Sequence, residues 1–123
     1  MKHLIYNMRS SDPPPSGYGD TKGWFYYYKW KVDEEVYVPW SLELTPEAGD
    51  VLWFAMNGVV LGCTIVLRVL TDDLNGRLEV WYLGSQIYEV NKYLDVAIGR
   101  DSLTPEEGSE WLNNLLEKNP LAN

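Results

Sequence analysis

Two apolar runs separated by a two-residue turn dominate the centre of the chain. Residues 51–56 are wholly apolar, Asn57-Gly58 follows, and a longer apolar run extends over 59–70. Asn-Gly between apolar runs is a strong short-range signal for a β-hairpin. We therefore expect paired strands at 51–56 and 59–70. A further strand at 77–83 would extend the hairpin into a three-stranded meander.

Alternating patterns predict most of the other strands. Leu4, Tyr6 and Met8 would share one face of a half-buried strand. Pro39 marks its segment as an edge strand or as no strand, because proline has no N–H for a sheet. The patterns predict strands at 3–9 and 24–32, an extended segment at 36–40, and short strands near 86–90 and 93–97.

Two Leu-Thr-Pro-Glu segments predict helix starts. Each places threonine at the N-cap and proline at the first helical position. The first predicts a short helical turn at 44–47. The second adds Glu107 at the capping-box position and predicts an amphipathic helix over 104–118 that packs on its own sheet. The apolar stripe of this helix consists of Trp111, Leu112, Leu115 and Leu116.

The 123 residues fit one domain, 1–123. Residues 10–23 form a loop rich in proline and glycine, and long loops in compact domains are often functional. We expect an α+β fold: a small, curved, mostly antiparallel β-sheet or partly open β-barrel, with a C-terminal amphipathic helix.

The formal net charge of −8, from 18 acidic and 10 basic residues, narrows the choice of partners. Broad contact with duplex nucleic acid requires clustered lysine and arginine, and here the basic residues are scattered. An acidic surface serves solubility, or it docks on a basic partner.

Cys63 and His3 are the only cysteine and the only histidine. Cys63 lies within an apolar run and is expected in the core, with no partner for an intrachain disulfide. One histidine and one cysteine do not nominate a metal site, and we expect no cofactor. The chain shows no signal peptide and no apolar run of membrane-spanning length, so we expect a cytoplasmic protein.

No catalytic constellation stands out, so we expect a protein that is not an enzyme; a carboxylate-dependent hydrolase or nuclease is the least supported alternative. The six tryptophans are the remaining candidates for a site. Trp53 and Trp81 lie inside strong strand patterns and are expected in the core. Trp24 and Trp40 adjoin loops and fit the walls of an aromatic pocket.

The order of these segments resembles the PUA-like superfamily, chiefly its EVE and YTH branches. Gly49-Asp50 ahead of a strand is similar to an EVE element. Phe54-Ala55-Met56-Asn57-Gly58 with Gly62 in the return strand is similar to a YTH hairpin. The resemblance covers about residues 3–83. It implies a small curved or barrel-like sheet that binds a modified or flipped base in an aromatic pocket.

The resemblance implies that Trp24 and Trp40 are stacking walls, that Asn7, Arg9 and Ser41 read polar groups, and that Asp50 is a turn residue. We thus expect a non-catalytic module that binds a modified nucleobase or nucleotide. The alternative is a small acidic interaction protein, of the kind that phages encode as inhibitors, which docks on a basic surface of a nucleic-acid-binding partner. The net charge of −8 limits the resemblance, because the hairpin supports a PUA-like architecture more than a nucleic-acid-binding role.

Overall fold

The computed structural model describes residues 1–8, 34–41, 44–56, 58–97 and 99–115. These residues form two sheets and the helix α2 (Pro105–Leu112). The expected loop at 10–23 and the expected strand at 24–32 lie outside the described residues.

The larger sheet has five strands in the order β7-β4-β3-β1-β8. The central strands β1 and β3 run parallel to each other, whereas the other neighbours pair in antiparallel fashion. The strands are β1 (His3–Met8), β3 (Val51–Met56), β4 (Val59–Ile65), β7 (Tyr88–Asp95) and β8 (Ser102–Leu103).

The smaller sheet has three antiparallel strands in the order β2-β6-β5. They are β2 (Glu35–Trp40), β5 (Arg68–Asp72) and β6 (Arg77–Leu83). Strand β2 lies at the edge of this sheet, so the prediction that Pro39 indicates an edge is confirmed for this segment.

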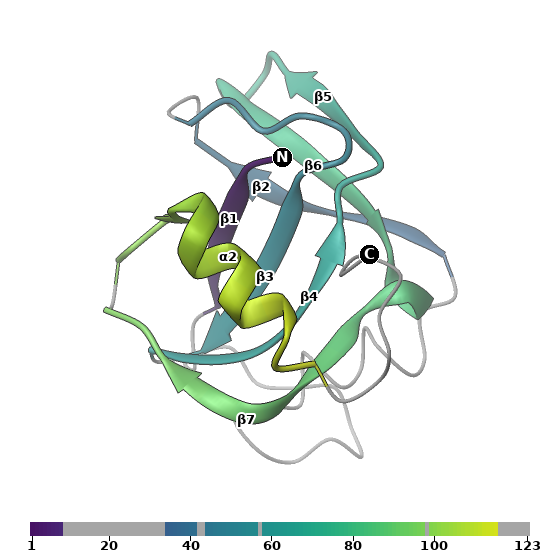
Figure 1. Ribbon diagram of the computed structural model, residues 1–123. Helices are drawn as coiled ribbons and strands as arrows, with labels where there is room; N and C mark the ends of the chain where they lie inside the picture. Colours follow the sequence, from purple (N-terminus) through teal and green to yellow (C-terminus); the bar gives the residue numbers. More distant parts are fainter. Residues whose placement is uncertain (9–33, 42–43, 57, 98, 116–123) are drawn as a thin grey trace.

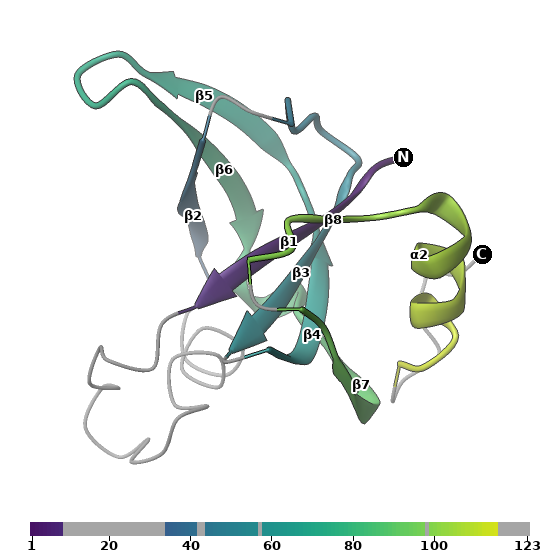
Figure 2. The same ribbon diagram turned by 90° about the vertical axis from the view of Figure 1, so that its left-hand side faces the viewer.

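The elements form three layers, with the larger sheet in the middle (Figures 1 and 2). Helix α2 covers one face of β1, β3 and β4, and the smaller sheet covers the other face. Strand β3 is therefore buried along its whole length. Leu52, Phe54 and Met56 belong to the core between the sheets, whereas Val51 and Trp53 belong to the core beneath the helix. Burial on both faces explains why this strand reads as a continuous apolar run.

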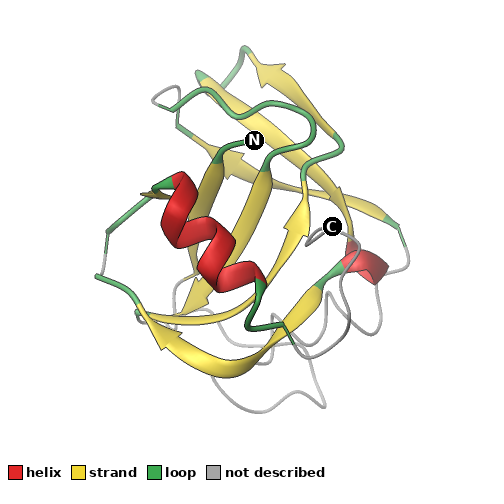
Figure 3. Cartoon of the chain, in the orientation of Figure 1, coloured by secondary structure: helices red, strands yellow, loops and turns green. Residues whose placement is uncertain are grey.

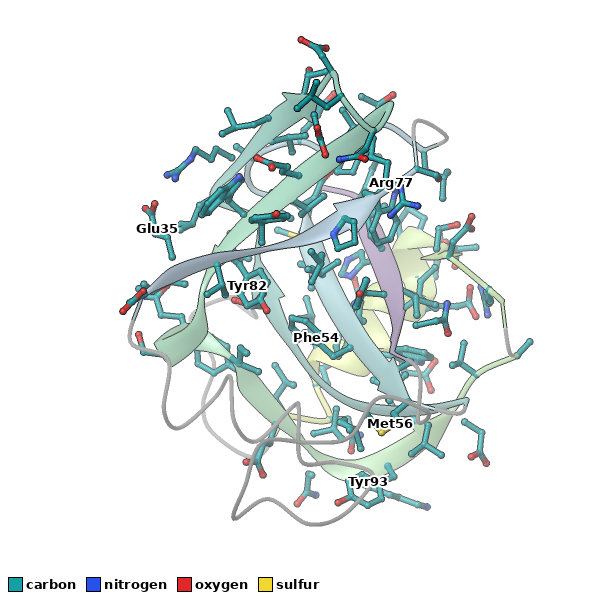
Figure 4. The ribbon with its side chains drawn as sticks, turned by 180° about the vertical axis from the view of Figure 1, so that it is seen from behind. Glu35, Phe54, Met56, Arg77, Tyr82 and Tyr93 are labelled. Carbon is teal, nitrogen blue, oxygen red and sulfur yellow. The ribbon has the colours of Figure 1, made fainter. Side chains whose placement is uncertain are left out.

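The core between the sheets contains aromatic side chains. The rings of Phe54 and Tyr82 meet edge to face, with their centroids 5.3 Å apart. Figure 4 labels both residues, which lie near each other in this core. The helix side has a similar contact, in which the rings of Trp53 and Trp111 meet edge to face at 5.3 Å. The prediction that the helix packs on its own sheet is confirmed.

The Asn-Gly hairpin is also confirmed. Met56 pairs with Val59 across a two-residue loop, and Gly58 has a φ of 79°. A positive φ is what a tight hairpin turn requires and what glycine adopts without steric cost.

The single strand expected at 59–70 is wrong, because the chain passes from one sheet to the other near Val66. The backbone N–H of Val66 donates to the carbonyl of Asp50 in the larger-sheet region. The N–H of Leu67 donates to the carbonyl of Trp81 on β6. The predicted meander is therefore divided between two sheets: its β3–β4 hairpin belongs to one and its β5–β6 hairpin to the other.

The helical turn expected at 44–47 is also wrong, since this segment is irregular. The buried carboxylate of Asp50 accepts hydrogen bonds from the backbone N–H groups of Glu47, at 2.8 Å, and Lys2, at 2.9 Å. The local Asp50–Glu47 contact and the long-range Asp50–Lys2 contact together outweigh the capping signal. They also confirm that Asp50 holds a turn.

Strands β1 and β7 also differ from expectation. Strand β1 has buried residues on both faces, because α2 covers the side of His3 and Ile5 that was expected to be exposed. The two short strands expected at 86–90 and 93–97 are one strand, β7, preceded by the 3-10 turn η1 (Gly84–Gln86).

Helix α2 ends at Leu112, before the expected end at 118. The chain then pairs with β7: the N–H of Asn91 donates to the carbonyl of Asn114, and Leu115 forms a β-bridge with Val90. Residues 116–118 lie outside the described part of the chain.

The fold is therefore dominated by β-structure, with two mostly antiparallel sheets and α2 (Figure 3). Within the described residues the strands form two open sheets and no closed barrel.

Candidate binding face on the three-stranded sheet

The smaller sheet turns one face toward the core and the other toward solvent. Val38, Val80 and Tyr82 are buried in the core. Because successive side chains of a strand point to opposite faces, Tyr37 and Trp81 lie on the solvent side. We call this side the outer face and define it by the residues Glu35, Tyr37, Arg68, Glu79 and Trp81.

The sheet register places three side chains of the outer face in one row. Tyr37 on β2 is paired with Trp81 on β6, and Trp81 is paired with Arg68 on β5. The ring centroids of Tyr37 and Trp81 lie 4.9 Å apart, with 43° between the planes. The guanidinium carbon of Arg68 lies 4.8 Å from the centroid of the Trp81 ring, within the range of a cation–π contact.

Two carboxylates border this row and hold its members in place. The Oε2 atom of Glu35 lies 2.6 Å from Nη1 of Arg68. The indole N–H of Trp81 donates to Oε1 of Glu79 at 3.2 Å. The row remains open to solvent, since 48% of the surface of Tyr37 is exposed and the side chains of Arg68 and Glu35 are 44% and 45% exposed.

The outer face offers two kinds of interaction. The Tyr37–Trp81 pair offers two adjoining, mutually tilted ring faces, on which a planar or cationic group can stack. The carboxylates of Glu35 and Glu79 beside it can accept hydrogen bonds from a cation. The five residues that define the outer face do not include a nucleophile paired with a base.

Sequence reasoning placed Trp81 in the core, and this prediction is wrong. The alternation in β6 held the necessary signal, because Leu78, Val80 and Tyr82 share one face and Trp81 belongs to the other. Aromatic character suggested burial, whereas strand parity correctly indicates exposure. Trp53, the other tryptophan expected in the core, is fully buried as predicted.

Trp40 and Ser41 lie together at the end of β2. Trp40 is 7% exposed and belongs to the core between the sheets, whereas Ser41 is exposed. The indole N–H of Trp40 is buried and finds no acceptor among the described residues. A buried donor without an acceptor is uncommon in proteins, because its lost hydration is not compensated.

Asn7 lies elsewhere, near the end of β1, and its side chain donates to the carbonyl of Arg100 at 3.0 Å. In Figure 1, β1 and β2 end at well-separated places. The structure therefore does not bring Asn7 together with Trp40 and Ser41. The remaining predicted site residues, Arg9 and Trp24, lie outside the described residues.

Cys63 and His3 are both buried, each in a different setting. Burial raises the pKa of the Cys63 thiol, and this residue belongs to the core beneath the helix, as predicted. The Nδ1 atom of His3 accepts the indole N–H of Trp53 at 3.1 Å. Burial lowers the pKa of His3, and the N-terminal ammonium group lowers it as well, while Asp50 acts in the opposite direction.

No family model matches the chain, and neither a curated protein nor a solved structure matches it. Across the described part of the chain, no group of three or more histidine, cysteine, aspartate or glutamate residues is placed to hold a metal ion. None of the described helices has both the length and the apolar character needed to cross a membrane.

Proposed function

We propose that the protein is a non-catalytic interaction module that binds a basic segment of a partner protein on its outer face. The observation that carries this proposal is the Tyr37–Trp81 pair, of which Tyr37 is half exposed and Trp81 partly buried, bordered by Glu35 and Glu79. Single exposed apolar residues are common on protein surfaces, but adjoining aromatic rings beside carboxylates are a favourable setting for cations.

The contact between Arg68 and Trp81 supports the choice of a guanidinium as the recognised group. Arg68 lies over the Trp81 ring and pairs with the carboxylate of Glu35. The outer face thus already accommodates one arginine by stacking and by an ion pair. A partner arginine beside Tyr37 would use the same chemistry.

The charge of the whole chain supports the same class of partner. A formal net charge of −8 attracts basic surfaces and repels nucleic-acid backbones. The partner could itself bind nucleic acid through its basic surface, so docking here would compete with that binding. A cytoplasmic location stays a prediction.

Fluorescence anisotropy with a labelled oligo-arginine peptide tests this proposal. Tyr37→Ala should weaken binding about 2- to 25-fold, the range expected for loss of a cation–π contact. Glu79→Gln should weaken binding and reduce its salt dependence. Tyr93→Ala is the matched control, because Tyr93 is 47% exposed but lies on β7 of the larger sheet.

The control should bind as the wild type does, and an oligo-glutamate peptide should not bind. Equal losses in the Tyr37 and Tyr93 variants would show that the outer face is not the binding site. Binding of neither peptide nor of any basic protein would contradict the proposed function.

A second candidate function is the binding of a modified base or nucleotide beside Trp40. It is favoured by the buried indole N–H of Trp40, for which the described residues offer no acceptor. A carbonyl oxygen or ring nitrogen of a base is a suitable acceptor. Ser41 lies next to Trp40 and could contribute a hydroxyl group. A PUA-like relationship would fit this function and remains a proposal.

Titration with modified nucleosides, monitored by tryptophan fluorescence, tests the second candidate. Trp40→Phe keeps an aromatic ring but removes the N–H, so it should abolish any ligand-dependent change. Trp111→Phe serves as the control, because Trp111 belongs to α2, on the other side of the larger sheet. Absence of a spectral change with every nucleoside would contradict this candidate.

A further inference from the structure

Strand β5 is a sheet edge with exposed leucines. It pairs with β6 on one side, and no described strand pairs with its other side. Figure 2 shows the β5–β6 hairpin projecting from the body, on the side away from α2. Leu70 in this strand is 43% exposed, Leu67 just before it is 39% exposed, and Leu74 in the hairpin loop is 97% exposed.

Natural proteins protect exposed edges from pairing with other chains, usually with prolines, bulges or inward-pointing charges. Strand β5 contains no proline, and its register with β6 is regular from Arg68 to Asp72. Its two charged residues have opposite signs, so they do not exclude a second copy of the same strand.

The sequence of β5 is complementary to itself in charge. Arg68 and Asp72 lie two positions before and two positions after Leu70. If two copies pair in antiparallel fashion with Leu70 opposite Leu70, Arg68 of each copy lies directly opposite Asp72 of the other. All three residues share one face of the strand by parity. Opposite charges in directly facing positions stabilise antiparallel pairs.

The contacts within the chain leave both charged groups able to form this pair. Nη1 of Arg68 binds Glu35, and a guanidinium has five N–H donors in all. The carboxylate of Asp72 accepts from the side chain of Asn75 at 2.7 Å, and each carboxylate oxygen can accept more than one bond.

We propose that β5 is a self-association edge, on which a second copy of this chain pairs about a two-fold axis through Leu70. The two smaller sheets would then form one continuous sheet of six strands, and the same residues of both copies would form the interface. This contact runs along the β5 edge of the sheet, whereas the basic partner stacks beside Tyr37 on β2, the strand at the opposite edge; the two surfaces share Arg68.

Sedimentation equilibrium over a range of protein concentrations tests the proposal. The average mass should rise from 14.2 kDa toward twice that value between about 10 µM and 1 mM, the weak range expected for a small interface. Arg68→Asp and Asp72→Arg should each remain monomeric, because each places like charges opposite one another. Circular dichroism would verify that both variants are folded.

An equimolar mixture of the two variants is the decisive measurement. In the mixed pair, both facing positions again carry opposite charges, so dimers should reappear only on mixing. Asp95→Arg makes the same charge change on β7 and should dimerise as the wild type does. A wild type that stays at 14.2 kDa up to 1 mM, self-association unaffected by Asp72→Arg, or a mixture that stays monomeric would each overturn the proposal.

Discussion

Gly108 determines how closely α2 approaches β1. A Cβ atom at this position would overlap the imidazole ring of His3, so the helix can pack here only without a side chain. Gly108→Ala ordinarily favours a helix by about 0.5–1 kcal/mol. Here it should lower the free energy of unfolding by about 1–3 kcal/mol, because overpacking forces the helix away from the sheet.

Urea denaturation measures this effect. Ser109→Ala is the matched control, since Ser109 is exposed on the same helix and its substitution should change stability by less than about 0.5 kcal/mol. A Gly108→Ala variant as stable as the wild type would show that α2 is not held against His3.

The hydrogen bond between His3 and Trp53 makes the stability of the protein depend on pH. Its Nδ1 atom accepts the Trp53 N–H, and a protonated imidazole cannot accept this bond. Because burial holds the pKa of His3 below the ordinary value of 6.5, the unfolded chain binds the proton more readily. The contribution of neutral His3 to the free energy of unfolding should be fully present above pH 6.5 and should decrease as the pH drops below that value.

The urea midpoint at several pH values between 5 and 8 tests this expectation. His3 is the only histidine of the chain. A His3→Asn variant should therefore be less stable at neutral pH, and its urea midpoint should lose most of its dependence on pH in this range. An unchanged pH profile in the variant would assign the dependence to other groups.

At the scale of the elements, α2 begins where local chemistry predicts. Thr104 accepts the N–H of Glu107 at 3.2 Å, and the carboxylate of Glu107 accepts the N–H of Thr104 at 3.1 Å. The ion-paired hydrogen bond from Arg100 holds the pKa of Glu107 at about 2, and the Thr104 N–H contributes to the lowering. The capping box is therefore charged, and complete, across the physiological pH range.

Thr104→Ala should lower the free energy of unfolding by about 1 kcal/mol, because it removes the acceptor for one helix N–H. Thr104→Ser keeps the hydroxyl group and should retain most of that stability. Thermal denaturation of both variants measures the difference, and an equal loss in the two would show that the cap itself does not stabilise the helix.

At the scale of the whole molecule, the larger sheet is shared by two cores. Adjacent residues of β1 face opposite ways: Leu4 packs between the sheets and Ile5 packs beneath the helix, and each is 1% exposed. Since β1, β3 and β4 contribute to both cores, neither core can be lost without the other. The described residues should therefore unfold in a single transition.

Leu4→Ala and Ile5→Ala form a matched pair for this test. Each should lower the free energy of unfolding by about 2–5 kcal/mol, and circular dichroism and tryptophan fluorescence should still report the same midpoint. Separate midpoints in either variant would show that the two cores unfold independently.

Local patterns in the chain were sufficient for the features that depend on neighbouring residues. Turn chemistry predicts the Asn57-Gly58 hairpin, capping predicts the start of α2 at Thr104, and an apolar run predicts the burial of Cys63. The missing N–H of proline predicts the edge position of Pro39. Each of these features depends on a few consecutive residues, and the local conformational preferences of these residues agree with the folded structure.

Long-range contacts alone established the rest. Partners far away in the chain determine three features: the division of 59–70 between two sheets, the irregular segment around Asp50, and the early end of α2. The outer face exists because β2, β5 and β6 meet in one register, which aligns Tyr37, Trp81 and Arg68. Strand parity can indicate that a side chain leaves the core, but only the pairing of strands shows which side chains it meets.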